Sequence, residues 1–227
     1  MKAIILAAGL GTRMGELTKD CPKTMLLIEG QPKLVYSIKS LPQEIEEVII
    51  IIGYLGEQIK RFFGNEYDGR KITYITQENL NGSAGAVILA KDKITEKVLV
   101  IMGDDLYDKD DLKEILKYDQ ALLAYETDKA EKFGLVGIDK DGYLTEVVER
   151  PHGKTKGLVN TGAYVLSPEY FKMPMVPISD KEFGLPQTLV SMYPKYKTKV
   201  IKTKKWQPVG SPSELALARE RIKEFIY

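Results

Sequence analysis

Short apolar runs that end near glycines constrain the fold of this sequence more than any other feature. Residues 3–7, 47–52 and 97–102 form such runs, and continuous apolar segments of this length are typical of strands buried on both faces. Residues 34–41 and 55–63 carry apolar side chains at helical spacing. Alternating strands and helices predict right-handed crossovers and an α/β fold with a mainly parallel sheet.

The rest of the chain extends this pattern with further strands and three further helices. A helix over residues 83–90 follows a third strand at 72–76, with Gly82-Ser83 as its N-cap. After residue 120, Asp139-Lys140-Asp141-Gly142 predicts a hairpin turn, and Ser211 predicts the cap of a last helix. The expected later elements are strands at 121–125, 134–138, 143–148, 158–166 and 200–203, and helices at 185–193 and 211–225. We expect one domain over residues 1–227 with two lobes, 1–120 and 121–227.

Composition limits the chemistry that is available. The chain has one cysteine, Cys21, and one histidine, His152, which excludes a disulfide framework, a cysteine-based zinc site and a histidine-rich metal centre, and makes a Ser-His-Asp triad improbable. Carboxylates, Lys/Arg and backbone amides remain, and they suit phosphates and magnesium. Lys+Arg number 33 against 32 Asp+Glu, so a nucleic-acid partner is not expected. The apolar runs are too short for a membrane span or a signal peptide, and we expect a cytoplasmic protein.

A glycine-rich segment follows the first predicted strand and reads Leu6-Ala7-Ala8-Gly9-Leu10-Gly11-Thr12-Arg13-Met14, with Pro22-Lys23 further on. Glycines at this place let backbone amides approach a nucleotide. The segment lacks the Gly-Lys-Ser/Thr of a P-loop. It also differs from the dinucleotide-binding G-x-G-x-x-G, because Gly15 falls one place late and no helix is expected to follow promptly. This loop, residues 77–82 and the turn at 103–105 all follow strands, so they are expected at one sheet edge, where ligands bind in such folds.

Together these segments resemble the signature of the sugar-phosphate nucleotidyltransferases, the pyrophosphorylases that make nucleotide sugars. Further matches in the same order are Gln77 with Gly82-Ser83-Ala84, Gly103-Asp104, Phe133-Gly134-Leu135-Val136, Glu149-Arg150-Pro151, Val159-Asn160-Thr161-Gly162-Ala163-Tyr164, and the segment from Trp206 to Ala218. The resemblance covers nearly the whole chain. It implies a three-layer α/β sandwich of the nucleotide-diphospho-sugar transferase type, with a mainly parallel, dinucleotide-fold-like mixed sheet.

The resemblance also implies substrates, a cofactor and roles. An NTP and a sugar 1-phosphate would be the partners, Mg²⁺ the cofactor, and the protein a monomer or homodimer, with residues 1–120 as the nucleotide lobe and 121–227 as the sugar-phosphate lobe. Arg13, Lys23 and Asp104 would be catalytic, with Asp104 binding the metal. The implied nucleotide-binding residues are Leu6, Ala7, Ala8, Gly9, Gly11, Thr12, Arg13, Gln77, Gly82 and Ser83; the implied sugar-phosphate residues are Gly134, Glu149, Arg150, Asn160 and Thr161.

Two departures from the family pattern bear on activity. Arg150 stands where the family often has lysine, which preserves the charge. Pro208 stands where the family commonly has a second metal-binding aspartate, two residues after Trp206. Mg²⁺ needs only one or two carboxylates beside substrate phosphates, so Asp104 could suffice, with Glu214 or Asp105 assisting. The alternative is a catalytically weak relative that binds nucleotide sugars and has a regulatory role.

The choice of substrates is predicted from a few positions. Ala8 resembles the uridylyl-transferring members, which favours UTP, with dTTP also possible. Gly15-Glu16-Leu17-Thr18 instead resembles cytidylyltransferases that act on choline or inositol phosphates. Glu149 and Asn160 favour a hexose. We expect no hexapeptide-repeat acyltransferase domain after residue 227.

Overall fold

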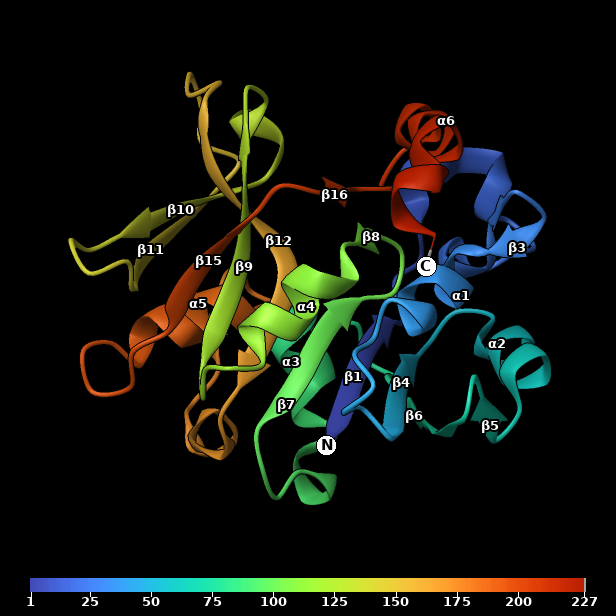
Figure 1. Cartoon of the computed structure of the whole chain (residues 1–227), viewed down its shortest axis with the longest axis horizontal. Helices are drawn as coiled ribbons and strands as arrows, with labels where there is room; N and C mark the ends of the chain where they lie inside the picture. The colour runs from blue at the N-terminus through green and yellow to red at the C-terminus, as the bar shows by residue number, and fades with distance from the viewer. Residues whose placement is uncertain (227) are drawn as a thin grey trace.

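The centre of the molecule is a ten-stranded mixed sheet whose first half is parallel (Figure 1). In the computed structural model, which describes residues 1–226, β1 (Lys2–Ala7) pairs in parallel with β4 (Glu47–Ile52) and β7 (Val98–Met102). Strand β6 (Arg70–Thr76) extends this half by pairing with β4. The apolar side chains of β1 and β4 are almost fully buried, which is why their sequences lack alternation. The predicted parallel strands are confirmed, while Tyr227 lies outside the described residues.

Helices cover both faces of the sheet and complete the expected three layers. On one face, α1 (Lys33–Lys39), α2 (Gly56–Phe63) and α4 (Lys109–Ile115) share a core with one side of β1 and β4. On the other face, α3 (Gly82–Ile88) and α5 (Leu185–Ser191) share a second core with the opposite side. The three-layer α/β prediction is therefore confirmed.

The second half of the chain continues the same sheet with antiparallel strands. Strand β12 (Gly157–Leu166) pairs with β7 and with β9 (Ala121–Thr127), and β15 (Lys199–Thr203) pairs in parallel with β9. Strands β10 (Gly134–Ile138) and β11 (Leu144–Glu149) form the predicted hairpin. Its turn closes with the Gly142 N–H donating to the Asp139 carbonyl at 3.0 Å. The two predicted lobes thus share one sheet, and their separate roles stay a prediction.

The C-terminal helix packs on the loop that follows β1, so segments far apart in the sequence lie side by side at one edge of the sheet (Figure 1). Helix α6 (Pro212–Arg221) begins with the predicted cap, since the Ser211 hydroxyl accepts a bond from the Glu214 N–H. The single helix expected to residue 225 is wrong, because the last turn tightens into a 3₁₀ helix, Ile222–Phe225. Leu215 of α6 is buried with Met14 and Ile28.

Two other local expectations need correction. The 3₁₀ helix η1 (Thr12–Thr18) does follow the glycine loop at once, although Gly15 (φ 58°) interrupts it. Ser83 does not cap α3, because its hydroxyl accepts a bond from the distant Leu185 N–H at 3.0 Å.

The remaining short elements are η2 (Lys23–Met25), β2 (Leu27–Ile28), β3 (Gln31–Pro32), β5 (Glu66–Tyr67), η3 (Lys91–Lys93), β8 (Leu106–Tyr107), η4 (Ala130–Lys132), η5 (Pro168–Lys172), β13 (Val176–Pro177), β14 (Phe183–Gly184) and β16 (Trp206–Gln207).

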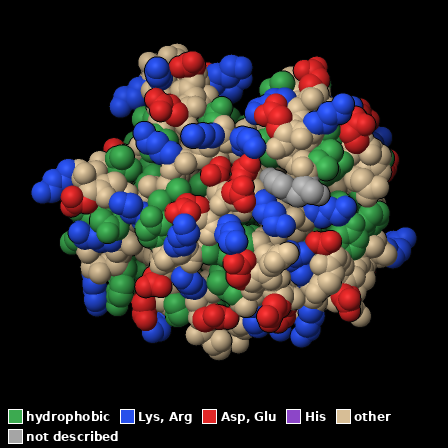
Figure 2. Space-filling model, viewed as in Figure 1, with side chains coloured by type: hydrophobic (Ala, Val, Ile, Leu, Met, Phe, Trp, Pro, Cys, Tyr) green, Lys and Arg blue, Asp and Glu red, His purple; other side chains and the backbone are tan. Residues whose placement is uncertain are grey.

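Charges of both signs are interspersed over the face of the molecule seen in Figure 2, in keeping with the formal net charge of +1. Within residues 1–226, every helix is too short or too polar to cross a membrane.

Candidate active site

The glycine loop after β1 forms one wall of a cavity of about 400 Å³ at the carboxyl ends of the parallel strands. Gly11 adopts φ +70°, and a Cβ there would lie 2.9 Å from the Lys23 Cβ, so the loop requires glycine. The Thr18 hydroxyl and the Met14 N–H both donate to the Gly11 carbonyl and hold the loop closed. All of the predicted nucleotide-binding residues line this cavity: Leu6, Ala7, Ala8, Gly9, Gly11, Thr12, Arg13, Gln77, Gly82 and Ser83.

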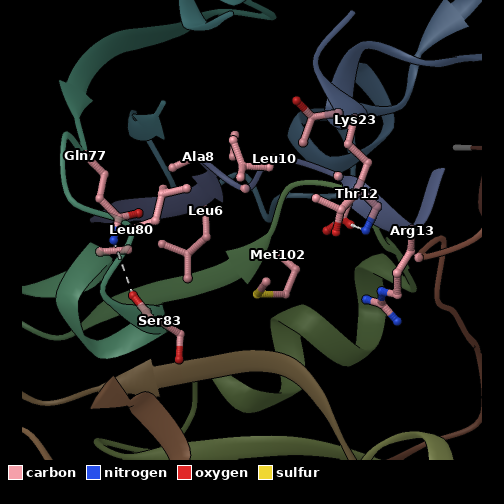
Figure 3. A pocket seen from close by; sticks show the side chains of 18 of the residues that line it. Leu6, Ala8, Leu10, Thr12, Arg13, Lys23, Gln77, Leu80, Ser83 and Met102 are labelled. Atoms are coloured by element: carbon pink, nitrogen blue, oxygen red, sulfur yellow. Dashed lines mark hydrogen bonds and ion pairs between the residues drawn. The ribbon is translucent and has the colours of Figure 1, made fainter. Parts of the chain in front are cut away.

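The cavity has a polar end at each side of an apolar middle. Figure 3 shows Arg13 and Lys23 at one end, Gln77 and Ser83 at the other, and Leu6 between them. Such a division matches a ligand whose anionic groups and polar ring are separated by a less polar part. The structure thus brings the predicted phosphate and base positions together in one cavity.

Asp104 lies at the cationic end, where β7 stops. Its carboxylate is buried and forms an ion pair with the Lys23 ammonium. Burial by itself raises the pKa of Asp104, but the nearby charges of Lys23 and Lys33 outweigh it, and the pKa is below its ordinary value. Asp104 is therefore an anion, as a metal ligand must be. The Arg13 guanidinium packs against Gly210, because a Cβ on Gly210 would lie only 3.1 Å from Arg13 Nη2.

Asp105 has a different task from its neighbour. It accepts bonds from Trp206 Nε1 at 3.2 Å and from the Val209 N–H at 3.0 Å, so it fastens residues 206–209 to the sheet edge. These contacts give Asp105 a structural role. Neither aspartate caps α4, because Asp108 accepts the first N–H bonds of that helix.

Lys33 completes this charged cluster and was missed in the sequence. Its side chain is fully buried, and its ammonium donates to the Val209 carbonyl at 3.3 Å. Burial lowers the pKa of Lys33 to about 8, although Asp104 and Asp105 act in the opposite direction. A lysine after Pro32 offers no local sign that a carbonyl far along the chain will be its partner.

The carboxylates around Asp104 limit how a metal can bind. No group of three or more metal-ligating side chains occurs within residues 1–226. Glu214 accepts the Gly210 N–H at 2.7 Å, and Asp105 accepts bonds from two donors. Both carboxylates that were expected to assist Asp104 in metal binding therefore already accept hydrogen bonds within the protein. Mg²⁺ commonly binds one or two carboxylates together with substrate phosphates and waters. Asp104 with a triphosphate fits this requirement.

Gln77 is held in one orientation at the far end of the cavity. Its Nε2 donates to Asn81 Oδ1 at 3.1 Å and to the Gly82 carbonyl at 3.4 Å. Since a carbonyl can only accept, these contacts fix the amide. The Gln77 Oε1 is left as an acceptor for a ligand.

A second, larger cavity of about 850 Å³ adjoins the first, and all the predicted sugar-phosphate residues line it: Gly134, Glu149, Arg150, Asn160 and Thr161. Asn160 Nδ2 donates to the Tyr164 hydroxyl at 2.6 Å. The Thr161 hydroxyl donates to the Leu123 carbonyl and the Thr161 carbonyl accepts a bond from the Tyr107 hydroxyl, so both groups already have partners within the protein. Arg150 is exposed and carries a left-handed φ of 45°.

Two further polar residues of this second cavity were not predicted from the sequence. Gln187 Nε2 donates to Glu149 Oε1 at 3.0 Å, and Glu182 lines both cavities. Both lie in or near the start of α5, where the sequence predicts only a helix. The partner of Gln187 lies 38 residues away along the chain, so no local motif could have marked this residue.

Comparison with known proteins identifies the family. A family model described as "Nucleotidyl transferase" matches residues 2–224. The chain belongs to the nucleotidyl transferase family. A UTP–glucose-1-phosphate uridylyltransferase, AglF of Haloferax volcanii, is 30% identical over 237 residues, which cover 99% of this chain and 97% of that protein.

Other relatives extend this comparison. The bifunctional protein GlmU of Methanocaldococcus jannaschii is 33% identical, and the match covers 100% of this chain and 55% of GlmU. The chain therefore spans about half the length of several curated relatives that it matches. A putative glucose-1-phosphate thymidylyltransferase from Bacillus anthracis has the same fold, with a TM-score of 0.87, 24% identity and coverage of 100% of this chain and 97% of that one. The expected nucleotide-diphospho-sugar transferase fold is confirmed.

Proposed function

We propose that the protein transfers a nucleotidyl group from an NTP to a sugar 1-phosphate and releases pyrophosphate. The observation that carries this proposal is that the two cavities share Arg13, Lys23 and Asp104 along their common border. A triphosphate in the smaller cavity and a sugar phosphate in the larger one would therefore meet at the same charged groups. Family membership supports the same reaction class.

The reaction needs positioning and charge stabilisation rather than a strong base. A phosphate oxygen of the sugar phosphate, already anionic, attacks the α-phosphorus of the NTP in line. The new P–O bond forms as the bond to the pyrophosphate oxygen breaks, and pyrophosphate leaves with its electron pair. Arg13 and Lys23 would hold the phosphates against their mutual repulsion and stabilise the charge on the leaving group.

Mg²⁺ is the cofactor that we propose. Asp104 would hold it together with phosphate oxygens, and the bound ion would reduce the negative charge of the triphosphate. Lys23, which now pairs with Asp104, would then be available to a phosphate.

UTP is the nucleotide that we propose, with dTTP as the second candidate. The fixed Gln77 amide presents Oε1, an acceptor, and uracil and thymine carry an N3–H donor in the ring whereas cytosine carries an acceptor at N3. The AglF relative is named for UTP and glucose 1-phosphate. We accordingly propose a hexose 1-phosphate as acceptor, read by Glu149 and Asn160.

A two-stage experiment tests this function. Thermal shift with UTP, dTTP, CTP, GTP and ATP plus Mg²⁺ should give the largest stabilisation with UTP. Pyrophosphate release with UTP and glucose 1-phosphate should then follow and should stop when EDTA removes the metal. A large shift with CTP alone would favour a cytidylyltransferase for a non-sugar phosphate. Binding without pyrophosphate release, for every nucleotide and several sugar phosphates, would contradict the enzyme and favour a regulatory relative.

A further inference from the structure

Residues 178–187 form a wall that connects the two ends of the site. The Phe183 N–H donates to the Asn81 carbonyl at 2.9 Å, and the Leu185 N–H donates to the Ser83 hydroxyl at 3.0 Å. At the other end of the segment, Gln187 donates to Glu149. The segment therefore joins the loop proposed to read the base to a side chain proposed to read the sugar.

Close backbone packing holds this wall in place. A Cβ on Gly82 would lie 2.4 Å from the Phe183 carbonyl oxygen, so that contact depends on glycine. The Glu182 backbone is also fixed, because its N–H donates to the Ser179 hydroxyl at 3.2 Å and its carbonyl accepts the Ile178 N–H at 2.8 Å. The position of the Glu182 Cα is thus determined by its neighbours.

The Glu182 side chain is the unexplained group on this wall. It is exposed, lines both cavities, and has no ion pair or side-chain hydrogen bond to any residue in the described range 1–226. Asp104, the other acid on the common border, is neutralised by Lys23. An uncompensated carboxylate repels phosphates, so it is useful in this site only opposite the part of a substrate that carries hydrogen-bond donors.

We propose that Glu182 is a specificity-determining residue for the acceptor. Its carboxylate accepts bonds from hydroxyl or amino groups of the sugar, away from the phosphate, and rejects sugars that carry a carboxylate. The Glu149 carboxylate, held through one oxygen by Gln187, adds a second acceptor in the same cavity. This inference rests on the proposed function, and it narrows the acceptor to neutral or amino hexose 1-phosphates rather than hexuronic acid 1-phosphates.

The test compares E182Q and E182A with D180N, a control on the same exposed segment whose residue lines neither cavity. Pyrophosphate release is measured with UTP and either glucose 1-phosphate or glucuronic acid 1-phosphate. Because a hydrogen bond to a charged group is at stake, E182A should raise the KM for glucose 1-phosphate about 10-fold. E182Q should reduce the preference for glucose over glucuronic acid by about 10-fold. The KM for UTP should not change, and D180N should match the wild type.

An unchanged sugar preference in E182Q, or a rise in the KM for UTP in place of the sugar KM, would overturn the inference. Failure of the proposed function would look different, because the wild type itself would release no pyrophosphate with any pair. In that case calorimetric binding of glucose 1-phosphate decides: equal Kd values for wild type and E182A contradict the role of Glu182, and a Kd raised about 10-fold in E182A supports it.

Discussion

The two cavities that meet at Asp104 are built in opposite ways. The smaller one takes its largest group of lining residues from one continuous stretch, residues 6–13, and the others come from shorter segments such as Gln77 and the start of α3. The larger one collects side chains from β10, β11, β12, α5 and the segment after β16, which are far apart in the sequence. A phosphate-binding loop can be encoded locally because backbone amides do the binding. A hydroxyl-binding site needs side chains brought in from several elements.

The largest expected effect is at Asp104, one of the residues that both cavities share. Asp104→Asn removes the only carboxylate on their border that we assign to the metal, so kcat should fall by about 10²–10³-fold. Steady-state pyrophosphate release at saturating substrates measures this. Asp119→Asn, a change at a side chain that is 96% exposed, is the control and should leave kcat unchanged. A loss below about fivefold would show that the two cavities do not depend on Asp104 for a common reaction step.

The same contrast explains what could be predicted from the sequence. Strand β1 and the glycine-rich loop after it follow from local patterns, since apolar runs and glycines act on their immediate neighbours. The nucleotide-binding roles of Gln77, Gly82 and Ser83 were implied by the family resemblance. Ser83 was wrongly expected to cap α3, because its partner Leu185 lies 102 residues away. Lys33 and Gln187 gave no signal for the same reason: their partners lie 176 and 38 residues away. The predicted roles of the sugar-side residues rest on the family resemblance alone.

The second expected effect separates the nucleotide end from the sugar end. Gln77→Ala removes an acceptor that is fixed by Asn81 and Gly82, and the KM for UTP should rise about 10-fold with the loss of one well-placed hydrogen bond. The KM for glucose 1-phosphate should stay constant. Varying each substrate in turn gives both values, and Glu78→Ala, at the exposed neighbouring position, should behave as wild type. Equal changes in both KM values would indicate that Gln77 supports the whole site instead of the base.

A smaller effect is expected at the sugar end, where Gln187 acts through Glu149. Gln187→Ala should raise the KM for glucose 1-phosphate by about threefold, because Glu149 keeps its carboxylate but loses the bond that orients it. Glu149→Ala should cost more, and the double variant should cost no more than Glu149→Ala alone, since the two residues form one contact. Additive effects on this KM would contradict a positioning role. Gln43→Ala, at an exposed glutamine far along the chain, serves as the control.

The smallest effect on rate is expected at Asp105, whose contribution is to stability. Burial and the adjacent Asp104 raise the pKa of Asp105 to about 7, from an ordinary value of 3.8. Below pH 4 the carboxyl is protonated in the folded and the unfolded chain, so its full contribution is present. Between pH 4 and pH 7 the unfolded chain ionises first, and the folded protein loses stability as the pH rises.

Asp105→Asn removes this titration while the amide oxygen can still accept one bond from Trp206 or Val209. The free energy of unfolding of the variant, minus that of the wild type, should therefore increase from pH 4 to pH 7 and level off above. Because a single carboxyl changes the number of bound protons by at most one between the folded and the unfolded chain, the slope should stay below about 1.4 kcal/mol per pH unit. Urea unfolding at each whole pH value measures this difference. If the difference in unfolding free energy did not change with pH, the charged and the neutral Asp105 carboxyl would hold residues 206–209 equally well, and this prediction would be contradicted.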